Sequence, residues 1–168
     1  MEKVAQFYKV SLEQFKKDWL DTFGEQVCVE EIYDQLILPK RATIGSAGYD
    51  FFAPISIKLH PNETIKIPTG IKVKINDGWA LLIYPRSGLG FKYRLQINNT
   101  VGIIDSDYFM ATNEGHIFVK MTNSTNENKI VEVAQGQGFA QGIFMPFGIT
   151  FDDNVEENRI GGFGSTTK

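Results

Sequence analysis

After residue 27 the chain alternates apolar and polar residues with a period of two, and this pattern restricts the fold more than any other feature. Apolar side chains occupy every second position in the segments 55–59, 71–75 and 117–121. Such alternation buries one face of a strand and leaves the other face in water. Turn-forming Pro, Gly, Asn and Asp residues separate the segments at a spacing of roughly 8–12 residues. We therefore predict a mainly β fold of the sandwich, barrel or jelly-roll type.

The N-terminal part of the chain follows a different period. Apolar residues recur there every three or four positions, as on one face of a helix: Leu12, Phe15, Trp19, Leu20 and Phe23. Ser11 and Gln14 fit a capping box at the start of this helix, and Gly24 fits its end. We predict a helix over residues 11–23 that packs against its own subunit, and we find no second convincing stretch of helical periodicity.

These patterns predict three regions. Residues 1–26 form an N-terminal helical extension, residues 27–151 a β-rich core and residues 152–168 a flexible C-terminal arm. The last region is polar and then glycine-rich, so we expect no ordered element there.

The composition excludes several classes of protein. The 168 residues include 17 Lys and Arg against 20 Asp and Glu, for a net charge of −3. A sequence-independent binder of duplex nucleic acid needs a surplus of basic residues, so we expect no nucleic-acid partner. No apolar run approaches the roughly 20 residues that span a bilayer, so we expect no membrane partner. The single Cys28 cannot form an intrachain disulfide, which is typical of a reducing compartment, and we expect its side chain to be buried.

Five short segments interrupt the β pattern with residues that form strands poorly. They are residues 46–50, 84–90, 99–108, 136–141 and 159–167. Taken singly, each has a structural interpretation: an Asx turn at Asp50, a β-turn at 85–88, a hairpin tip at 105–107 and a glycine linker at 161–164. Their combination is more informative than any one of them.

Together the segments carry groups that suit a polyphosphate. Arg86 with the adjacent Ser87 and Gly88 offers a guanidinium fork, a hydroxyl and an accessible backbone N–H for phosphate oxygens. A second arginine begins the glycine-rich arm, which ends in further hydroxyl side chains. The carboxylates of Asp50 and Asp105 could hold Mg²⁺ through water or accept a proton from water.

In this order the five segments resemble the five motifs of the trimeric deoxyuridine triphosphate nucleotidohydrolases (dUTPases). The resemblance covers roughly residues 30–168, and residues 99–108 are its most specific stretch. It implies a dUTPase-like β-clip or jelly-roll barrel, to which the N-terminal helix is an addition. It also implies a homotrimer with shared active sites, in the cytoplasm of a bacterium or of a virus-infected host cell.

The resemblance implies hydrolysis of dUTP to dUMP and pyrophosphate, with Mg²⁺ as the cofactor. Asp105 would activate water for attack on the α-phosphorus. Asp50 would act on Mg²⁺ through water, while the substrate phosphates hold the ion. The implied substrate-binding residues are Arg86, Ser87, Gly88, Asn99, Gly102, Ile103, Ile104, Tyr108, Phe118, Gln141, Arg159, Phe163, Gly164, Ser165 and Thr166.

The resemblance also assigns roles within this set. Asn99 and the backbone of residues 102–105 would recognise uracil, and Tyr108 would lie under the deoxyribose and leave no room for a 2′-hydroxyl. Residues 86–88 of a neighbouring subunit would hold the phosphates, with a contact from Gln141.

The C-terminal arm would complete the site. Phe163 would stack on the uracil when the arm closes. This closure would bring Arg159, Ser165 and Thr166 onto the γ-phosphate.

Several features depart from the family pattern. The helix at 11–23 and a small insertion at 109–115 are additions, and Thr167 replaces an expected glycine. His60 and His116 have no evident triad or metal partner, so we interpret both as structural or surface residues. Two alternatives remain open: a dUTP-binding regulator that holds a protein partner and, less favoured, a dCTP deaminase, whose glutamate-centred site has no clear counterpart here.

Overall fold

Strands make up most of the regular structure in the computed structural model, which describes residues 1–24, 28–157, 159 and 161. The elements, with η1 a 3₁₀ helix, are β1 (Ala5–Lys9), α1 (Leu12–Phe23), α2 (Val29–Asp34), β2 (Lys40–Arg41), β3 (Tyr49–Phe52), β4 (Ile57–Leu59), β5 (Thr64–Pro68), β6 (Ile71–Ile75), β7 (Trp79–Pro85), α3 (Ser87–Tyr93), β8 (Leu95–Ile97), β9 (Gly102–Ile104), η1 (Ser106–Met110), β10 (Phe118–Asn123), β11 (Val131–Val133) and β12 (Gly138–Pro146).

The strands form four antiparallel sheets in a jelly-roll-like arrangement. The largest has the order β2-β3-β12-β7-β9, and a second has the order β5-β10-β8. Two smaller sheets pair β1 with β6 and β4 with β11. The inner faces of these sheets pack into one main hydrophobic core. The prediction of a mainly β fold is therefore confirmed.

The alternation seen in the sequence corresponds to the two faces of the strands. In β6, Ile71, Val73 and Ile75 are buried, while the intervening lysines lie on the outer side. In β10, Val119 and Met121 are likewise buried in the core. The period of two thus separates the core from the surface, as predicted.

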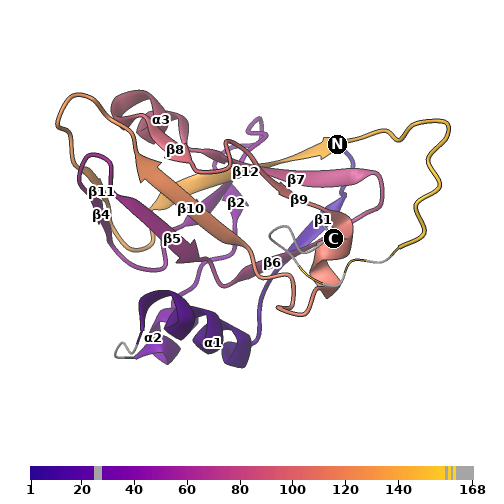
Figure 1. Ribbon diagram of the computed structural model, residues 1–168, viewed down its shortest axis with the longest axis horizontal. Coiled ribbons are helices and arrows are strands. Elements are labelled where there is room, and N and C mark those ends of the chain that lie inside the picture. Colours follow the sequence, from indigo (N-terminus) through magenta and orange to yellow (C-terminus); the bar gives the residue numbers. More distant parts are fainter. Residues whose placement is uncertain (25–27, 158, 160, 162–168) are drawn as a thin grey trace.

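The predicted N-terminal helix is confirmed as α1. The Ser11 hydroxyl accepts a hydrogen bond from the Gln14 N–H at 3.1 Å and caps the first turn. Phe15 and Trp19 are fully buried in a second cluster of apolar residues, which also contains Val29 of α2. In Figure 1, α1 and α2 lie next to each other at one side of the strands. The first residues also contain a strand that the sequence analysis missed, β1, which pairs with β6.

Three other expectations were wrong. The chain contains the further helices α2 and α3, of six and seven residues. The expected β-turn at 85–88 is the end of β7 followed by the start of α3. Cys28 is exposed rather than buried, and it directly precedes α2 with a left-handed φ of 64°.

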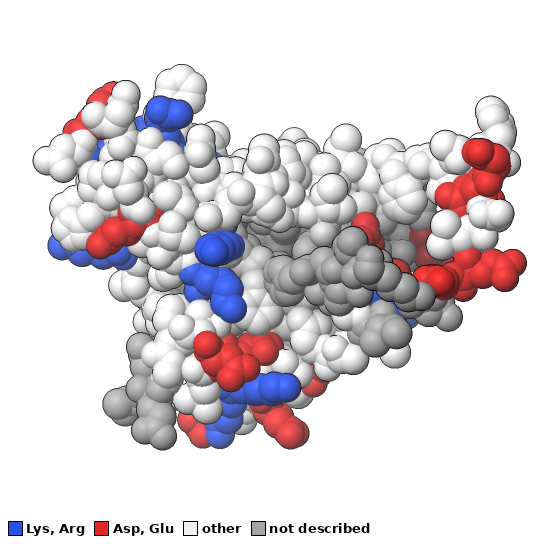
Figure 2. Space-filling model, viewed as in Figure 1, with Lys and Arg blue, Asp and Glu red and all other residues white. Residues whose placement is uncertain are grey.

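No helix among the described residues is long and apolar enough to cross a membrane. On the face shown in Figure 2, basic and acidic side chains form small separate groups rather than one continuous basic surface. This distribution agrees with the small net charge of −3.

Candidate active site

A cleft of about 300 Å³ opens beside β9, between the end of β8 and the start of β10. Eight of the residues predicted to form the active site line it: Asn99, Gly102, Ile103, Ile104, Asp105, Tyr108, Phe118 and Arg159. The sequence analysis missed its apolar lining, which comprises Ile83, Ile97, Val101, Ile117 and Val119. Four of them belong to strands or lie next to one and follow the ordinary apolar pattern, and Val101 lies in the turn before β9, so no local signal distinguishes them.

β9 gives the cleft a wall of backbone groups. It is the last strand of the five-stranded sheet, and it pairs with β7 through Ile83↔Gly102 and Leu81↔Ile104. Within the described residues no strand pairs with its other edge. An edge strand presents N–H and C=O groups that a flat polar ligand can bind.

The turn between β8 and β9 places Asn99 over that edge. Thr100 has a left-handed φ of 67°, and its N–H donates to the Ile97 carbonyl at 2.8 Å. In this tight turn, Asn99 Nδ2 lies 3.9 Å from the position that a Cβ atom would take on Gly102. The amide and the strand edge therefore face the same space.

Tyr108 forms a flat wall of the cleft. Its hydroxyl donates to the His116 carbonyl at 2.7 Å and accepts from Asn113 Nδ2 at 2.8 Å. Burial raises the pKa of Tyr108 above its ordinary value. Its ring faces the guanidinium of Arg159, 5.8 Å from the ring centre. Because the hydroxyl is occupied on the far side, Tyr108 offers a surface for packing and no acid or base.

Asp105 lies between the end of β9 and the start of η1, and its side chain stands at the rim of the cleft. The expected hairpin tip is in fact this junction of a strand with a 3₁₀ helix. The Arg159 guanidinium binds the Asp105 carboxylate and also donates from Nε to Asp107 Oδ1 at 2.8 Å. The structure therefore places Arg159 next to Asp105, and the two side chains form an ion pair.

A second group of predicted residues lies where β3, β12 and the end of β7 run side by side and where α3 begins. Arg86 Nε lies 3.1 Å from Asp50 Oδ1, and Gln141 Nε2 donates to the Pro85 carbonyl at 3.0 Å. Ser87 and Gly88 begin α3 and are exposed. None of this second group lines the cleft of the same chain. Four further predicted residues, Phe163, Gly164, Ser165 and Thr166, lie outside the described residues.

The carboxylates do not form a metal cage. No three His, Cys, Asp or Glu side chains converge in the part of the chain that the structure describes. Asp50 faces Arg86, and Asp105 faces Arg159. Isolated carboxylates of this kind suit a metal ion that a polyphosphate ligand brings and largely coordinates itself.

The comparisons with known proteins agree with this geometry. The model of the dUTPase protein family matches residues 34–167, and this range includes all five predicted motif segments. The chain belongs to the dUTPase family. A deoxyuridine 5′-triphosphate nucleotidohydrolase of Lactococcus lactis is 45% identical over 132 residues, covering 77% of this chain and 87% of that protein. The crystal structure of a dUTPase from Streptococcus mutans is 37% identical, with a TM-score of 0.59 over 70% of this chain and 90% of that one.

A dUTPase from phage phi11 of Staphylococcus aureus and one from the Staphylococcus bacteriophage 80alpha resemble this chain in fold over almost its full length. The phage phi11 enzyme, solved as a point mutant with a coordinated structural Mg(II) ion, is 20% identical. It covers 92% of this chain and 98% of its own, with a TM-score of 0.62. The phage 80alpha enzyme, solved with dUPNHPP, is 22% identical. It covers 98% of this chain and 99% of its own, with a TM-score of 0.64.

Proposed function

We propose that this chain hydrolyses dUTP to dUMP and pyrophosphate. The observation that carries the proposal is the cleft, where Asn99, Asp105 and Tyr108 meet in a chain of the dUTPase family. Its volume of about 300 Å³ is at the lower end for ligand pockets, so it suits a nucleoside better than a whole nucleoside triphosphate. We therefore place the base and the sugar in the cleft and the phosphates at its rim.

The edge of β9 supports recognition of uracil. Backbone groups of residues 102–104, together with the Asn99 amide, would hydrogen-bond the polar edge of the base. Such selection is strict, because a wrong base leaves buried polar groups without partners. The deoxyribose would lie on the Tyr108 ring, where a 2′-hydroxyl would meet the aromatic face. Phe118 and the aliphatic side chains of the cleft would cover the remaining apolar surface of the nucleoside.

Asp105 is the proposed general base. Its carboxylate would accept a proton from water as the water oxygen forms a bond to the α-phosphorus. The bond from that phosphorus to the bridging oxygen breaks, and its electron pair leaves with pyrophosphate. Arg159 must release Asp105 before this step. A guanidinium fork binds phosphate oxygens as readily as a carboxylate, so the incoming γ-phosphate can take the place of Asp105.

Mg²⁺ fits this site as an ion carried by the substrate. Mg²⁺ usually keeps several waters and takes one or two carboxylates together with substrate phosphates, which agrees with the isolated carboxylates found here. Asp50 would act on it through water, while also holding Arg86. When bound, the ion neutralises the charge that develops on the leaving pyrophosphate.

The separation of the two groups of residues supports an active site shared between subunits. Arg86, Ser87, Gly88 and Gln141 offer phosphate-binding groups, but they lie outside the cleft that contains Asp105. In a homotrimer, the phosphate-binding group of one subunit would meet the cleft of its neighbour. The residues of the arm, Phe163, Gly164, Ser165 and Thr166, would then close over the bound nucleotide.

Mixed trimers test the shared site. Asp105→Asn and Arg86→Ala subunits, each inactive alone, should recover activity when they are expressed together with different affinity tags. At equal amounts and random assembly, about one quarter of the sites combine an intact Asp105 with an intact Arg86 from the neighbour. Activity that stays at the level of the two parents would reject sharing between subunits, while leaving the proposed reaction intact.

A role as a dUTP-binding regulator with a protein partner is the alternative. It would account for a helix, α1, that precedes the family match at 34–167. Pyrophosphate release, measured for all the common nucleoside triphosphates with and without Mg²⁺, separates the two functions. We expect rapid release from dUTP alone and only with Mg²⁺. Tight dUTP binding without turnover would support the regulator, and release of ammonia from dCTP would indicate a deaminase.

A further inference from the structure

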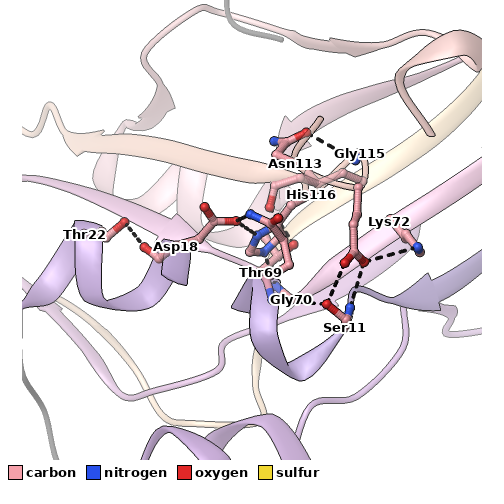
Figure 3. Close-up of polar contacts among 12 residues, drawn as sticks. Ser11, Asp18, Thr22, Thr69, Gly70, Lys72, Asn113, Gly115 and His116 are labelled. Atoms are coloured by element: carbon pink, nitrogen blue, oxygen red, sulfur yellow. Dashed lines mark hydrogen bonds and ion pairs between the residues drawn. The ribbon is translucent and has the colours of Figure 1, made fainter. Parts of the chain in front are cut away.

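A buried acid–imidazole pair joins α1 to the loop behind the cleft. Asp18 Oδ2 lies 2.5 Å from His116 Nδ1, and the two residues are 9% and 0% exposed. They are 98 positions apart in the sequence and face each other in Figure 3. The proposed reaction uses neither residue. Because burying ionisable groups costs free energy unless they are paired, each residue depends on the other to remain buried at this place.

The backbone determines the protonation of this pair. The Gly70 N–H donates to His116 Nε2 at 2.7 Å, so that nitrogen presents its lone pair. The ring proton therefore lies on Nδ1 and is donated to Asp18. Burial raises the pKa of Asp18, but hydrogen bonds from His116 and Gln14 outweigh that effect and keep the pKa below its ordinary value. The pair is thus a neutral imidazole and a carboxylate.

The same loop holds the hydroxyl end of Tyr108. The His116 carbonyl and the Asn113 amide are the two partners of that hydroxyl, at 2.7 and 2.8 Å. Asn113 is held in turn by the Gly115 N–H, which donates to its Oδ1 at 3.2 Å. A movement of residues 113–116 would therefore move the aromatic wall of the cleft.

The start of α1 fixes this loop at a second point. The Ser11 N–H and hydroxyl both donate to the Glu114 carboxylate, at 2.8 and 2.5 Å, and Lys72 Nζ lies 3.4 Å from it (Figure 3). Glu114 and Gly115 have left-handed φ angles of 59° and 72°. Such a turn keeps its shape only where its surroundings hold it, and α1 and its cap residue supply contacts on both sides of Gly115, at Glu114 and at His116.

We propose that α1 and the loop 111–116 form a clamp that positions Tyr108, with Asp18 and His116 as the positioning residues that set the selectivity for deoxyribose. This inference rests on the proposed function, because it gives Tyr108 the exclusion of a 2′-hydroxyl. The ring excludes that group only if it cannot retreat, and the two hydrogen bonds on its hydroxyl prevent the retreat. α1 precedes the family match at 34–167, so the clamp is an addition to the family's core.

The test is the ratio of kcat/KM for dUTP to that for UTP in the full-length protein. Asp18→Leu removes the acceptor of the His116 proton and keeps a side chain of similar size. We expect this ratio to fall by about tenfold, because small displacements of positioned groups have effects of this order or larger. Asp18→Asn retains an oxygen that can accept the proton, so its ratio should stay within about twofold of wild type. Val29→Ala is the control: it weakens the apolar cluster around α1 without touching the clamp.

A double-mutant cycle distinguishes positioning from a general loss of stability. Tyr108→Phe keeps the ring but removes the hydroxyl that the clamp holds. Asp18→Leu should therefore change the ratio much less in a Tyr108→Phe background than in wild type. Equal effects in both backgrounds would overturn the proposal. If Asp18→Leu fails to fold, Asn113→Ala decides, since it removes a partner of the hydroxyl in the surface loop and should lower the ratio in the same direction.

The experiments distinguish a failure of the clamp proposal from a failure of the proposed dUTP hydrolysis. If wild type hydrolyses dUTP, and Asp18→Leu and Asn113→Ala both keep the wild-type ratio, the clamp is rejected and the function stands. If wild type does not hydrolyse dUTP, the function is rejected together with the clamp. A parallel loss of activity towards dUTP and UTP, matched by Val29→Ala, would show that α1 contributes stability alone.

Discussion

Gly115 offers a quantitative test of how tightly the loop 111–116 packs on Tyr108. A Cβ at this position would lie 2.5 Å from the Tyr108 carbonyl oxygen and 2.8 Å from Phe109 Cα, both of them backbone atoms. The φ of 72° adds the cost of a left-handed conformation. That conformation costs about 1–2 kcal/mol for an L-residue, and overpacking costs about 1–3 kcal/mol more. Gly115→Ala should therefore lower the free energy of unfolding by about 2–5 kcal/mol.

Gly78→Ala is the matched control for this experiment. Gly78 has a similar φ of 79°, but a Cβ there would meet no atom within 4 Å. Only the conformational cost of about 1–2 kcal/mol applies, so urea unfolding should show Gly115→Ala to be clearly the less stable variant. Only Gly115→Ala should also lower the dUTP-to-UTP ratio. Equal stability of the two variants, with equal ratios, would refute the close packing of the loop on Tyr108.

Three further predictions follow from the site and the clamp. Asp105→Asn should lower turnover of dUTP by about 10²–10⁴-fold while dUTP binding, measured by calorimetry, stays close to wild type; unchanged turnover would reject Asp105 as the base. Deletion of residues 157–168 should reduce hydrolysis by about a thousandfold or more with an unchanged melting temperature, because it removes Arg159; full activity would contradict the role of the arm. The folded pKa of Asp18 lies below the ordinary 3.8, so its charge stabilises the fold above that pH and this contribution is lost as the pH falls. Urea unfolding should therefore show wild type more stable than Asp18→Asn near neutral pH and the difference shrinking below about pH 4, and a constant difference would refute the assignment.

The sequence predicted the fold class because strand alternation and helix periodicity are local signals. The lysines between Ile71, Val73 and Ile75 identified β6, and the apolar spacing from Leu12 to Phe23 identified α1. α3 could not be found in the same way. Its seven residues include two glycines, and only Leu89 and Tyr93 pack against the main core. One pair of apolar residues four positions apart is too short a pattern to predict a helix.

The candidate site was predictable residue by residue but not in its spatial grouping. Asn99, Asp105 and Tyr108 belong to one short segment, so their meeting in the cleft follows from a local motif. The separation of Arg86 from Asp105 depends on how the sheets are arranged in space. A short sequence motif carries no information about that arrangement. The contact of Asp18 with His116 is also invisible in the sequence, because the two residues are 98 positions apart and each has an ordinary structural interpretation alone.

The extra helix has a structural consequence that reaches the cleft. α1 buries Phe15 and Trp19 under the strands and contacts the loop 111–116 from its first turn and from Asp18. The helix α1 and the segment 109–115, which the sequence analysis predicted to be an insertion, therefore meet each other. Neither requires a separate partner to account for its burial.

Hydrolysis of dUTP in water enriched in heavy oxygen tests the central claim most directly. If water activated by Asp105 attacks the α-phosphorus, mass spectrometry will find one heavy oxygen in the product dUMP and none in the pyrophosphate, and the label will appear at a greatly reduced rate with Asp105→Asn. Label in the pyrophosphate, or incorporation by Asp105→Asn at the wild-type rate, would contradict the account.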